Sequence, residues 1–386
     1  NKISNTLSVV ANSLVYNGTS QTLVTVSGGN GPVYYSTSIQ LTSSNYSSSG
    51  TTTIPSEINA GSYTVYYYTP GNTNYNDKSG SVLVPIAKKV LTTTVSANNK
   101  TYDGSTDATC KVSLSGAVSG QAPTATSTGA FSNADVGNTK EVTCSNITLG
   151  SSWTSNYRLD ATSKTTTASI SVKSIAVSWG STVGWVYDGN SHIPSASIST
   201  GVSGETMSLS VSGAKTNAGS HTATASCNSV SGGRGVCSNY TLTNTTKTFS
   251  ITKASCSCTI LEVPSGLKYP GSSSGTVKYS CGGDGTISVS SSNTSVVTAG
   301  TPGSSSAILT VKGVGTSKIT LGRSAGTNYN ACTSDTKKII VPGTEYTLTL
   351  NSNDATTASN PTSVIATYES SQTNPKTITN PIKQWT

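Results

Sequence analysis

Short segments of alternating apolar and polar residues recur along the chain, and turns rich in Gly, Asn, Ser and Pro separate them. Residues 62–68 (SYTVYYY) and 307–313 (AILTVKG) are the clearest examples. Successive side chains of a strand point to opposite faces, so this alternation predicts strands with one buried face. We find no segment with helical periodicity. Many short strands at regular intervals predict an all-β chain of sandwich domains.

Three sequence marks recur in a fixed order. The first is a Tyr-Asp/Asn-Gly triplet, whose tyrosines, 86 and 85 residues apart, are Tyr16, Tyr102 and Tyr187. The second is a Gly-centred turn entering a strand, at NAGSYTV (59–65), ADVGNTKEV (134–142) and NAGSHTA (217–223). The third is an Asn-Tyr pair before the last strand, at 74–75, 156–157 and 239–240; a fourth, at 328–329, lacks an upstream triplet. Such a repeat predicts an array of one domain type.

The triplet has two interpretations. A phenol beside a carboxylate or amide could form a ligand site, or the triplet could recur because a domain recurs. Asp-Gly and Asn-Gly are strong signals for a two-residue hairpin, because both central residues can adopt positive φ. We predict a hairpin turn whose tyrosine ring packs on the sandwich while its hydroxyl is hydrogen-bonded. The triplet is then a mark of folding, and its spacing counts domains.

These marks carry a resemblance to known families. Residues 1–87 and 173–252 resemble the MBG group of bacterial immunoglobulin-like domains, and 88–172, with YDGSTDAT and FSNADVGNTKEVT, are similar to the related YDG domain. Residues 253–342, with the late hairpin VKGVGTSKIT, resemble the group 2 bacterial immunoglobulin-like domain, and 343–386 resemble the opening part of an internalin-type B-repeat. The resemblance implies an elongated tandem array of immunoglobulin-like β-sandwich domains from an adhesin-like surface protein. It carries over no catalytic residues. We call 1–87, 88–172, 173–252 and 253–342 the first to fourth blocks.

Composition excludes several classes of protein. Only 10% of residues are charged, against about 25% in typical soluble domains. The 18 tyrosines and the strand patterns argue against disorder. The net charge of +8 is spread thinly, without the basic runs of a nucleic-acid-binding protein. Apolar runs fall far short of the ~20 residues of a membrane span.

Eight cysteines fall in local groups: Cys110 and Cys144; Cys227 and Cys237; and Cys256, Cys258, Cys281 and Cys332. The single CxC spacing and the distant histidines do not fit a zinc site. We predict disulfides within the first two groups, and in the third we expect Cys256 and Cys258 each to bond one of the other two, with the choice left open. Disulfides indicate an oxidising compartment, so the protein is expected to be extracellular.

Candidate catalytic and metal-binding residues are few. His192 and His221 are the only histidines, and neither has the partners of a hydrolytic triad. Asp103 and Asp107 flank a turn, whereas glycoside hydrolysis needs two carboxyls held in one cleft. Residues 72–77 (NTNYND) carry too little charge for a tight calcium loop. We predict no catalytic residues, no metal and no cofactor.

Three exposed positions are candidate contacts: Arg234 at the tip of the Gly-rich loop SGGRGVC, and Tyr67 and Trp153 as stacking surfaces for sugars. Asn-x-Ser/Thr sequons, among them those at Asn17, Asn45, Asn146, Asn239, Asn244 and Asn293, are weak signals of glycosylation. Lys–Asn isopeptide bonds stay open, because both residue types are plentiful.

The blocks abut without flexible linkers, at 85–91, 171–177 and 251–256. Such connections favour a semi-rigid string of domains. Because the chain starts at Asn1 without an initiator Met, we expect it to be processed or part of a longer protein.

The expected function is a non-enzymatic stalk or adhesin segment on a cell surface, a filament or a virion. Its expected partners are a host or environmental surface glycan or protein and further domains of the same long chain, with no nucleic acid and no membrane span in this segment. The alternatives are a carbohydrate-binding surface module and an immunoglobulin-like structural protein of a phage virion.

Overall fold

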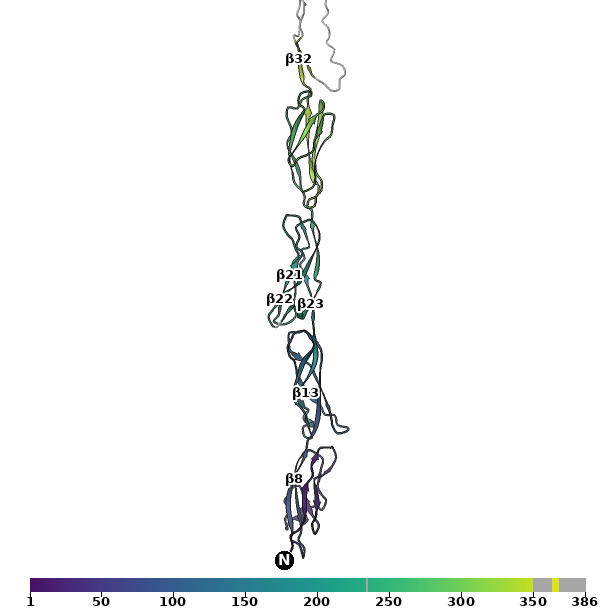
Figure 1. The fold of residues 1–386 in the computed structure, drawn as a ribbon, viewed down its shortest axis with the longest axis vertical. Coiled ribbons are helices and arrows are strands. Elements are labelled where there is room, and N and C mark those ends of the chain that lie inside the picture. Colours follow the sequence, from purple (N-terminus) through teal and green to yellow (C-terminus); the bar gives the residue numbers. More distant parts are fainter. Residues whose placement is uncertain (234, 350–362, 368–386) are drawn as a thin grey trace, which may run out of the picture. The chain divides into compact units, whose positions relative to one another are not determined.

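The structure is a computed structural model that describes residues 1–233, 235–349 and 363–367 (Figure 1). Strands dominate these residues, as the alternating pattern predicts. The helical elements within the described ranges are one turn, α1 (Tyr46–Ser49), and two short 3₁₀ turns, Ser151–Trp153 and Cys237–Asn239. Among the described residues we find no helix whose length and hydrophobicity would let it span a membrane.

The chain divides into two compact units, and the division runs through the third block. The first unit contains Asn1–Ile175, Ser199–Ser208 and Cys227–Thr243. The second contains Ala176–Ile198, Leu209–Ser226 and Asn244–Thr386.

The first block is a β-sandwich in the first unit. One sheet has the order β2 (Leu14–Val15), β8 (Lys78–Ala87), β7 (Gly61–Thr69), β5 (Tyr34–Ser36). Two strand pairs complete the block: β1 (Ser8–Ala11) with β4 (Val24–Ser27), and β3 (Gln21–Thr22) with β6 (Ser56–Glu57). Leu23, Val65 and Val84 have no exposed surface, and each contributes about 1.5–3 kcal/mol by its burial.

The second block, also in the first unit, has two sheets. The larger has the order β10 (Lys100–Thr101), β16 (Lys164–Ser171), β14 (Gly137–Leu149), β13 (Ala125–Phe131), β11 (Asp107–Ala108). The smaller has the order β12 (Cys110–Ser115), β9 (Lys89–Ala97), β15 (Tyr157–Leu159). The Cys110–Cys144 disulfide joins β12 to β14 and therefore ties the two sheets together.

The third block is built from a four-stranded sheet and two strand pairs. The sheet has the order β19 (Gly184–Val186), β24 (Thr246–Thr252), β22 (Gly219–Ser231), β21 (Thr206–Ser212). The pairs are β17 (Lys173–Ala176) with β23 (Tyr240–Thr243), and β18 (Ser178–Trp179) with β20 (Ala196–Ser197).

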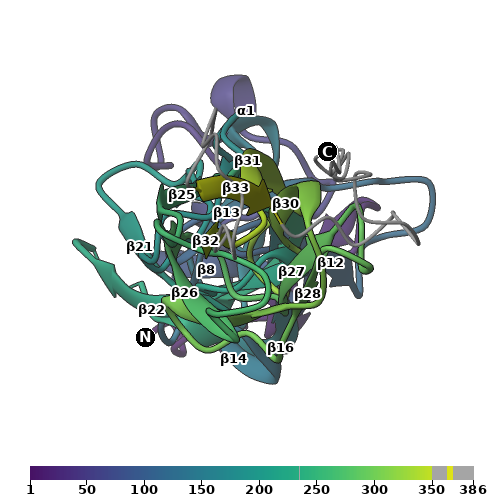
Figure 2. The same ribbon diagram turned by 90° about the horizontal axis from the view of Figure 1, so that it is seen from above.

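The fourth block, in the second unit, is again a two-sheet sandwich, and most of its strands are labelled in Figure 2. Its sheets have the orders β25 (Cys258–Glu262), β26 (Ser274–Cys281), β29 (Ser306–Val311), β28 (Val297–Ala299), and β27 (Ile287–Ser291), β30 (Gly315–Arg323), β31 (Cys332–Val341). Beyond it β32 (Glu345–Thr349) pairs antiparallel with β33 (Ser363–Thr367). The rest of the predicted B-repeat lies outside the described residues.

The prediction of a two-residue hairpin at the triplet is wrong. In the first block the strands on either side do not pair with each other: β2 runs parallel to β8, and β3 pairs with β6. Only the glycine of each triplet has positive φ, at 78°, 80° and 83° for Gly18, Gly104 and Gly189. The residue before it instead accepts a hydrogen bond from the amide two residues on, an Asx turn. These bonds are Asn17 to Thr19, Asp103 to Ser105 and Asp188 to Asn190, at 2.8–2.9 Å.

Candidate functional site: a joint repeated between consecutive blocks

Each triplet tyrosine contacts the tyrosine of the next block's Asn-Tyr pair. The rings meet edge to face, with interplanar angles of 80°, 78° and 72° in chain order. The centroid distances are 5.3 Å for Tyr16–Tyr157, 5.4 Å for Tyr102–Tyr240 and 5.4 Å for Tyr187–Tyr329. Edge-to-face pairs of this kind contribute about 0.5–1.5 kcal/mol beyond their buried area. We call these three contacts the first, second and third joints.

The asparagine of each Asn-Tyr pair completes the contact. Its Oδ1 accepts a hydrogen bond from an amide in the Gly-centred turn of the preceding block, and its Nδ2 donates to the residue before that amide. Asn156 binds Ala60 N (2.8 Å) and Asn59 Oδ1 (3.1 Å); Asn239 binds Val136 N (3.0 Å) and Asp135 Oδ1 (3.2 Å); Asn328 binds Ala218 N (2.9 Å) and Asn217 Oδ1 (3.3 Å). All three sequence marks therefore meet at one place.

Backbone hydrogen bonds fix both halves of the joint beside the connection between blocks. The triplet tyrosine donates its amide to the last strand of its own block, as Tyr16 N does to Ala87 O at 2.9 Å. The Asn-Tyr pair is held by the first strand of its block, as Lys89 N donates to Asn156 O at 2.9 Å. Only Lys88 separates Ala87 from Lys89, so the chain crosses between blocks next to the contact. The first and second joints lie wholly in the first unit, and the third lies wholly in the second.

In the first and second joints one further side chain bridges the two tyrosine hydroxyls. Gln121 donates from Nε2 to the Tyr16 hydroxyl (2.8 Å) and accepts from the Tyr157 hydroxyl. In the second joint Glu205 takes this place. Both residues end a Val-Ser-Gly-Gln/Glu segment, at 118–121 and 202–205.

Glu205 accepts hydrogen bonds from Tyr102 and Tyr240, both at 2.6 Å, and only 8% of it is exposed. Burial, followed by the hydrogen bond to Glu205, raises the pKa of Tyr102 to about 12, and it also raises the pKa of Tyr240 above its ordinary value. Both hydroxyls therefore stay protonated donors far into the alkaline range.

The triplet glycine packs against the valine of the same segment. A Cβ on Gly18 would lie 2.7 Å from Val118 Cγ1, and a Cβ on Gly104 would lie 2.7 Å from Val202 Cγ1. Glycine is thus required at these positions both by positive φ and by close approach. In the third joint Gly189 has no neighbour within 4 Å, and no side chain bridges the hydroxyls of Tyr187 and Tyr329 among the described residues.

The fourth block lacks a Tyr-Asp/Asn-Gly triplet, but one of its tyrosines makes the same backbone hydrogen bond as the triplet tyrosines. Tyr269 N donates to Pro342 O at 3.0 Å, as the triplet tyrosines do to their own last strands. The segment reads Tyr-Pro-Gly, and a search for Tyr-Asp/Asn-Gly therefore misses it.

The candidate sugar-stacking residues Tyr67 and Trp153 are half-buried and pack against other residues of the protein. Tyr67 is half-buried against the core of the first block, and its ring lies over Gly80 of the neighbouring strand, where a Cβ would come within 2.4 Å of its hydroxyl. Trp153 lies 6.1 Å from Tyr157, edge to face, and packs in the same cluster as the first joint. Arg234 lies outside the described residues.

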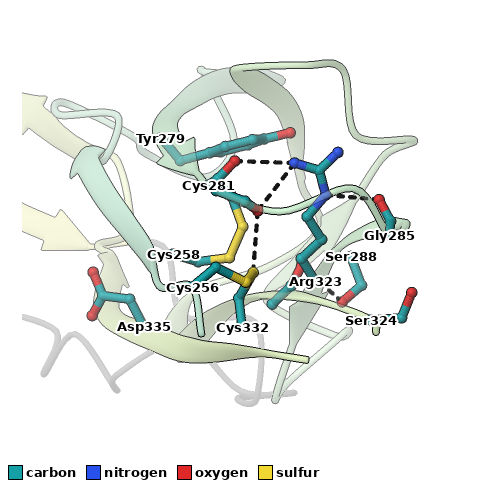
Figure 3. The surroundings of a disulfide bond; sticks show 12 residues. Cys256, Cys258, Tyr279, Cys281, Gly285, Ser288, Arg323, Ser324, Cys332 and Asp335 are labelled. Carbon is teal, nitrogen blue, oxygen red and sulfur yellow. Dashed lines mark hydrogen bonds between the residues drawn. A yellow bond between two sulfur atoms is a disulfide. The ribbon is translucent and has the colours of Figure 1, made fainter. Parts of the chain in front are cut away.

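The structure pairs Cys110 with Cys144 and Cys227 with Cys237, and it pairs Cys256 with Cys332 and Cys258 with Cys281, a choice that the sequence leaves open. Figure 3 shows the last two disulfides side by side, beside the Arg323 guanidinium, which donates to the carbonyls of Cys281, Gly282 and Gly285. The Sγ atoms of Cys258, Cys281 and Cys332 lie within 4.8 Å of one another, but disulfide sulfurs are not the thiolates that bind metals. Four disulfides fit an extracellular location.

The other polar candidates serve local structure. His192 stacks on Trp185 (5.1 Å) and binds Asp188 (2.8 Å), and His221 Nε2 lies 2.8 Å from Asn217 O. Asp103 forms an ion pair with Lys100 at 2.8 Å.

Residues 72–77 are likewise held by local hydrogen bonds. Asn72 Oδ1 accepts from the amides of Asn74 and Tyr75, both at 2.9 Å, and Asp77 accepts from the Tyr68 hydroxyl, also at 2.9 Å. The oxygens that would bind a cation therefore already cap backbone and side-chain donors.

Residues 87–167 match the YDG domain family. No curated protein matches the chain. Solved structures with a similar fold include the immunoglobulin domains 1–5 of Sidekick-1 (9% identity, TM-score 0.26, covering 88% of this chain and 78% of that one). They also include the extracellular cadherin domains 3–6 of Protocadherin Gamma B2 (11% identity, TM-score 0.23, covering 87% and 96%). The YDG match coincides with the second block, whose triplet forms the second joint.

Proposed function

We propose that this chain is a non-enzymatic structural segment of an extracellular surface protein, an adhesin-like stalk that holds a binding element away from the surface carrying it. The observation that carries the proposal is the recurrence of one joint at three successive block boundaries. Residues that an isolated domain would leave exposed are used here to fix one domain to the next. Such use suits a protein whose task is to keep its domains in order.

The disulfides support the same role. The loop between Cys110 and Cys144 spans a sequence separation of 34, and closing it stabilises the fold by about 3–4 kcal/mol on the chain-entropy model. Small polar domains bury a modest core, so this contribution offsets what the core lacks. A covalently braced domain suits exposure outside the cell.

The carbohydrate-binding alternative depends on exposed aromatic rings. Tyr67 and Trp153, on which it relied, pack against Gly80 and Tyr157. We therefore propose that the eventual target, a surface glycan or protein, is bound by another part of the full protein.

The proposal is tested on the surface of the cells or particles that carry the native protein. Immunogold labelling with antibodies against the first and fourth blocks should place the two labels at different distances from that surface. A chain with Tyr16, Tyr102 and Tyr187 all changed to Ala should bring the two distances closer together, whereas the matched variant Tyr66→Ala, outside the joints, should leave them unchanged. Labels at equal distances in the native protein contradict a stalk.

A further inference from the structure

The first block has an Asn-Tyr pair in the backbone setting of the three joints. Ile3 N donates to Asn74 O at 2.8 Å, and Ile3 bridges Tyr75 in parallel. The same contacts in the other blocks are Lys89 N to Asn156 O and Ala254 N to Asn328 O, both at 2.9 Å, with parallel pairing of Lys89 to Tyr157 and Ala254 to Tyr329. Asn74 and Tyr75 therefore stand where Asn156 and Tyr157 stand in the first joint.

The side chains of this pair are not used within the first block. Asn74 is exposed, and among the described residues neither its amide group nor the Tyr75 hydroxyl has a hydrogen-bond partner. In the joints, the equivalent asparagine binds two groups of the preceding block. Asn74 and Tyr75 thus correspond to the Asn-Tyr pair of a joint whose other partner, a triplet tyrosine with its Gly-centred turn, is not among the described residues.

A loop of the first block lies beside the pair. The Asn30 carbonyl accepts a hydrogen bond from Asn72 Nδ2 at 3.1 Å, and Asn72 Oδ1 accepts from the amides of Asn74 and Tyr75, both at 2.9 Å. These bonds fix the backbone of the Asn-Tyr pair and leave its side chains unpaired within the part of the chain that the structure describes.

We propose that this end of the first block is a docking surface for a further domain of the same polypeptide, one that carries a Tyr-Asp/Asn-Gly triplet and a Gly-centred turn. The proposal rests on the structural role proposed above and adds the partner that the role needs. The tyrosine of the incoming domain meets Tyr75 edge to face, and an amide of its turn donates to Asn74 Oδ1. Both contacts copy those seen in the three joints.

The residue spacing at the third joint shows how the incoming domain would be connected to the first block. Thr252 O accepts from Tyr187 N, and Ala254, two residues later, bridges Tyr329. Because Ile3 is the equivalent of Ala254, Asn1 is the equivalent of Thr252. The last strand of the incoming domain therefore continues directly into Lys2.

The test is a fusion in which a second copy of residues 173–252 precedes Lys2, with Thr252 in the place of Asn1 and the rest of the chain unchanged. The readout is the rate at which tetranitromethane nitrates Tyr75, followed by peptide mass spectrometry. We expect the fusion to slow nitration of Tyr75 about tenfold, the factor that corresponds to a contact of the aromatic-pair class. The matched control is the same fusion with Tyr187→Ala in the added copy only, which should restore the original rate.

A second fusion provides a result if the added copy of 173–252 does not fold. In this fusion residues 88–171 precede Lys2, with Ser171 in the place of Asn1. Protection of Tyr75 in either fusion supports the proposal. Equal nitration of Tyr75 in the parent chain and both fusions overturns it, provided that Tyr16 stays protected. Rapid nitration of Tyr16 in the parent chain instead contradicts the joints themselves, and with them the structural role.

Discussion

The second and third joints use the same contacts but bury them to different extents. In the second, Tyr102 and Asn239 are each 1% exposed, and Glu205 binds both tyrosine hydroxyls. In the third, Tyr187 and Asn328 are half-buried. The tyrosine pair and the asparagine thus define where two blocks meet, and the bridging residue sets how firmly they are held. We expect the second joint to be the stronger.

Removing the triplet tyrosine gives the largest expected difference between the two joints. Tyr102→Ala should cost about 3–5 kcal/mol, because it opens a cavity at a fully buried ring. Tyr187→Ala should cost about 1 kcal/mol, the value of an aromatic pair, because its ring is only half-buried. Hydrogen exchange at the Val136 and Ala218 amides measures local opening of each joint. Equal losses in the two variants would contradict the ranking.

The bridging carboxylate gives the next largest effect. Glu205→Ala leaves the buried hydroxyls of Tyr102 and Tyr240 without an acceptor, which should cost about 2–3 kcal/mol in opening free energy of the second joint. Glu205→Gln keeps one acceptor oxygen and copies Gln121 of the first joint, so its cost should be clearly smaller. Hydrogen exchange at the Val136 amide measures the opening free energy of the second joint in both variants. If Glu205→Gln lowers this free energy as much as Glu205→Ala does, the side chain does not bridge the two hydroxyls.

The asparagines provide a smaller contrast. Asn239→Ala should weaken the second joint by about 1–2 kcal/mol, because the half-buried amide of Val136 loses its acceptor and a buried side chain is removed. Asn328→Ala should weaken the third by about 0.5 kcal/mol, since water can replace the lost acceptor there. Asn74→Ala is the matched control, and exchange at Val136 and Ala218 should not respond to it.

Alkaline pH should affect the second joint without any mutation. Tyr102 has its pKa raised to about 12 in the folded chain, against an ordinary value of about 10. The stabilising effect is fully present below pH 10 and is lost as the pH rises from about 10 to 12, because the unfolded chain releases the proton first. Phenolate absorbance should show late-titrating tyrosines, and Tyr102→Phe should have one fewer of them, because Tyr240 still titrates late. A wild-type titration complete near pH 10 would contradict the burial of this hydroxyl.

The sequence predicts the all-β architecture well, because the alternation in segments such as 62–68 directly reflects one buried face. It also identifies all three marks that form the joint. The contact between the marks cannot be predicted from the sequence of one block, because Tyr16 and Tyr157 belong to two blocks and meet only when both have folded and lie next to each other. The triplet is misread as a hairpin because Asn-Gly and Asp-Gly favour a turn, whereas the strands on either side of it pair with other strands and not with each other.

The bridging residues carry a weaker signal. Gln121 and Glu205 are ordinary surface residue types, and only the shared Val-Ser-Gly before them marks the position. In the fourth block the sequence signal is absent instead: Tyr269 has the backbone hydrogen bond of a triplet tyrosine, but the segment reads Tyr-Pro-Gly. The sequence offers Tyr67 and Trp153 as candidate stacking surfaces, but it does not reveal that Tyr67 lies over a glycine of the neighbouring strand or that Trp153 lies beside a tyrosine ring.

The most direct test of the account is hydrogen exchange of three backbone amides in the unmodified chain. Ala60, Val136 and Ala218 donate to asparagine side chains of the following block. If the joints hold consecutive blocks together, all three amides exchange slowly, Val136 more slowly than Ala218. Exchange of all three at the rate of open loop amides would contradict the joints as the basis of the protein's structural role.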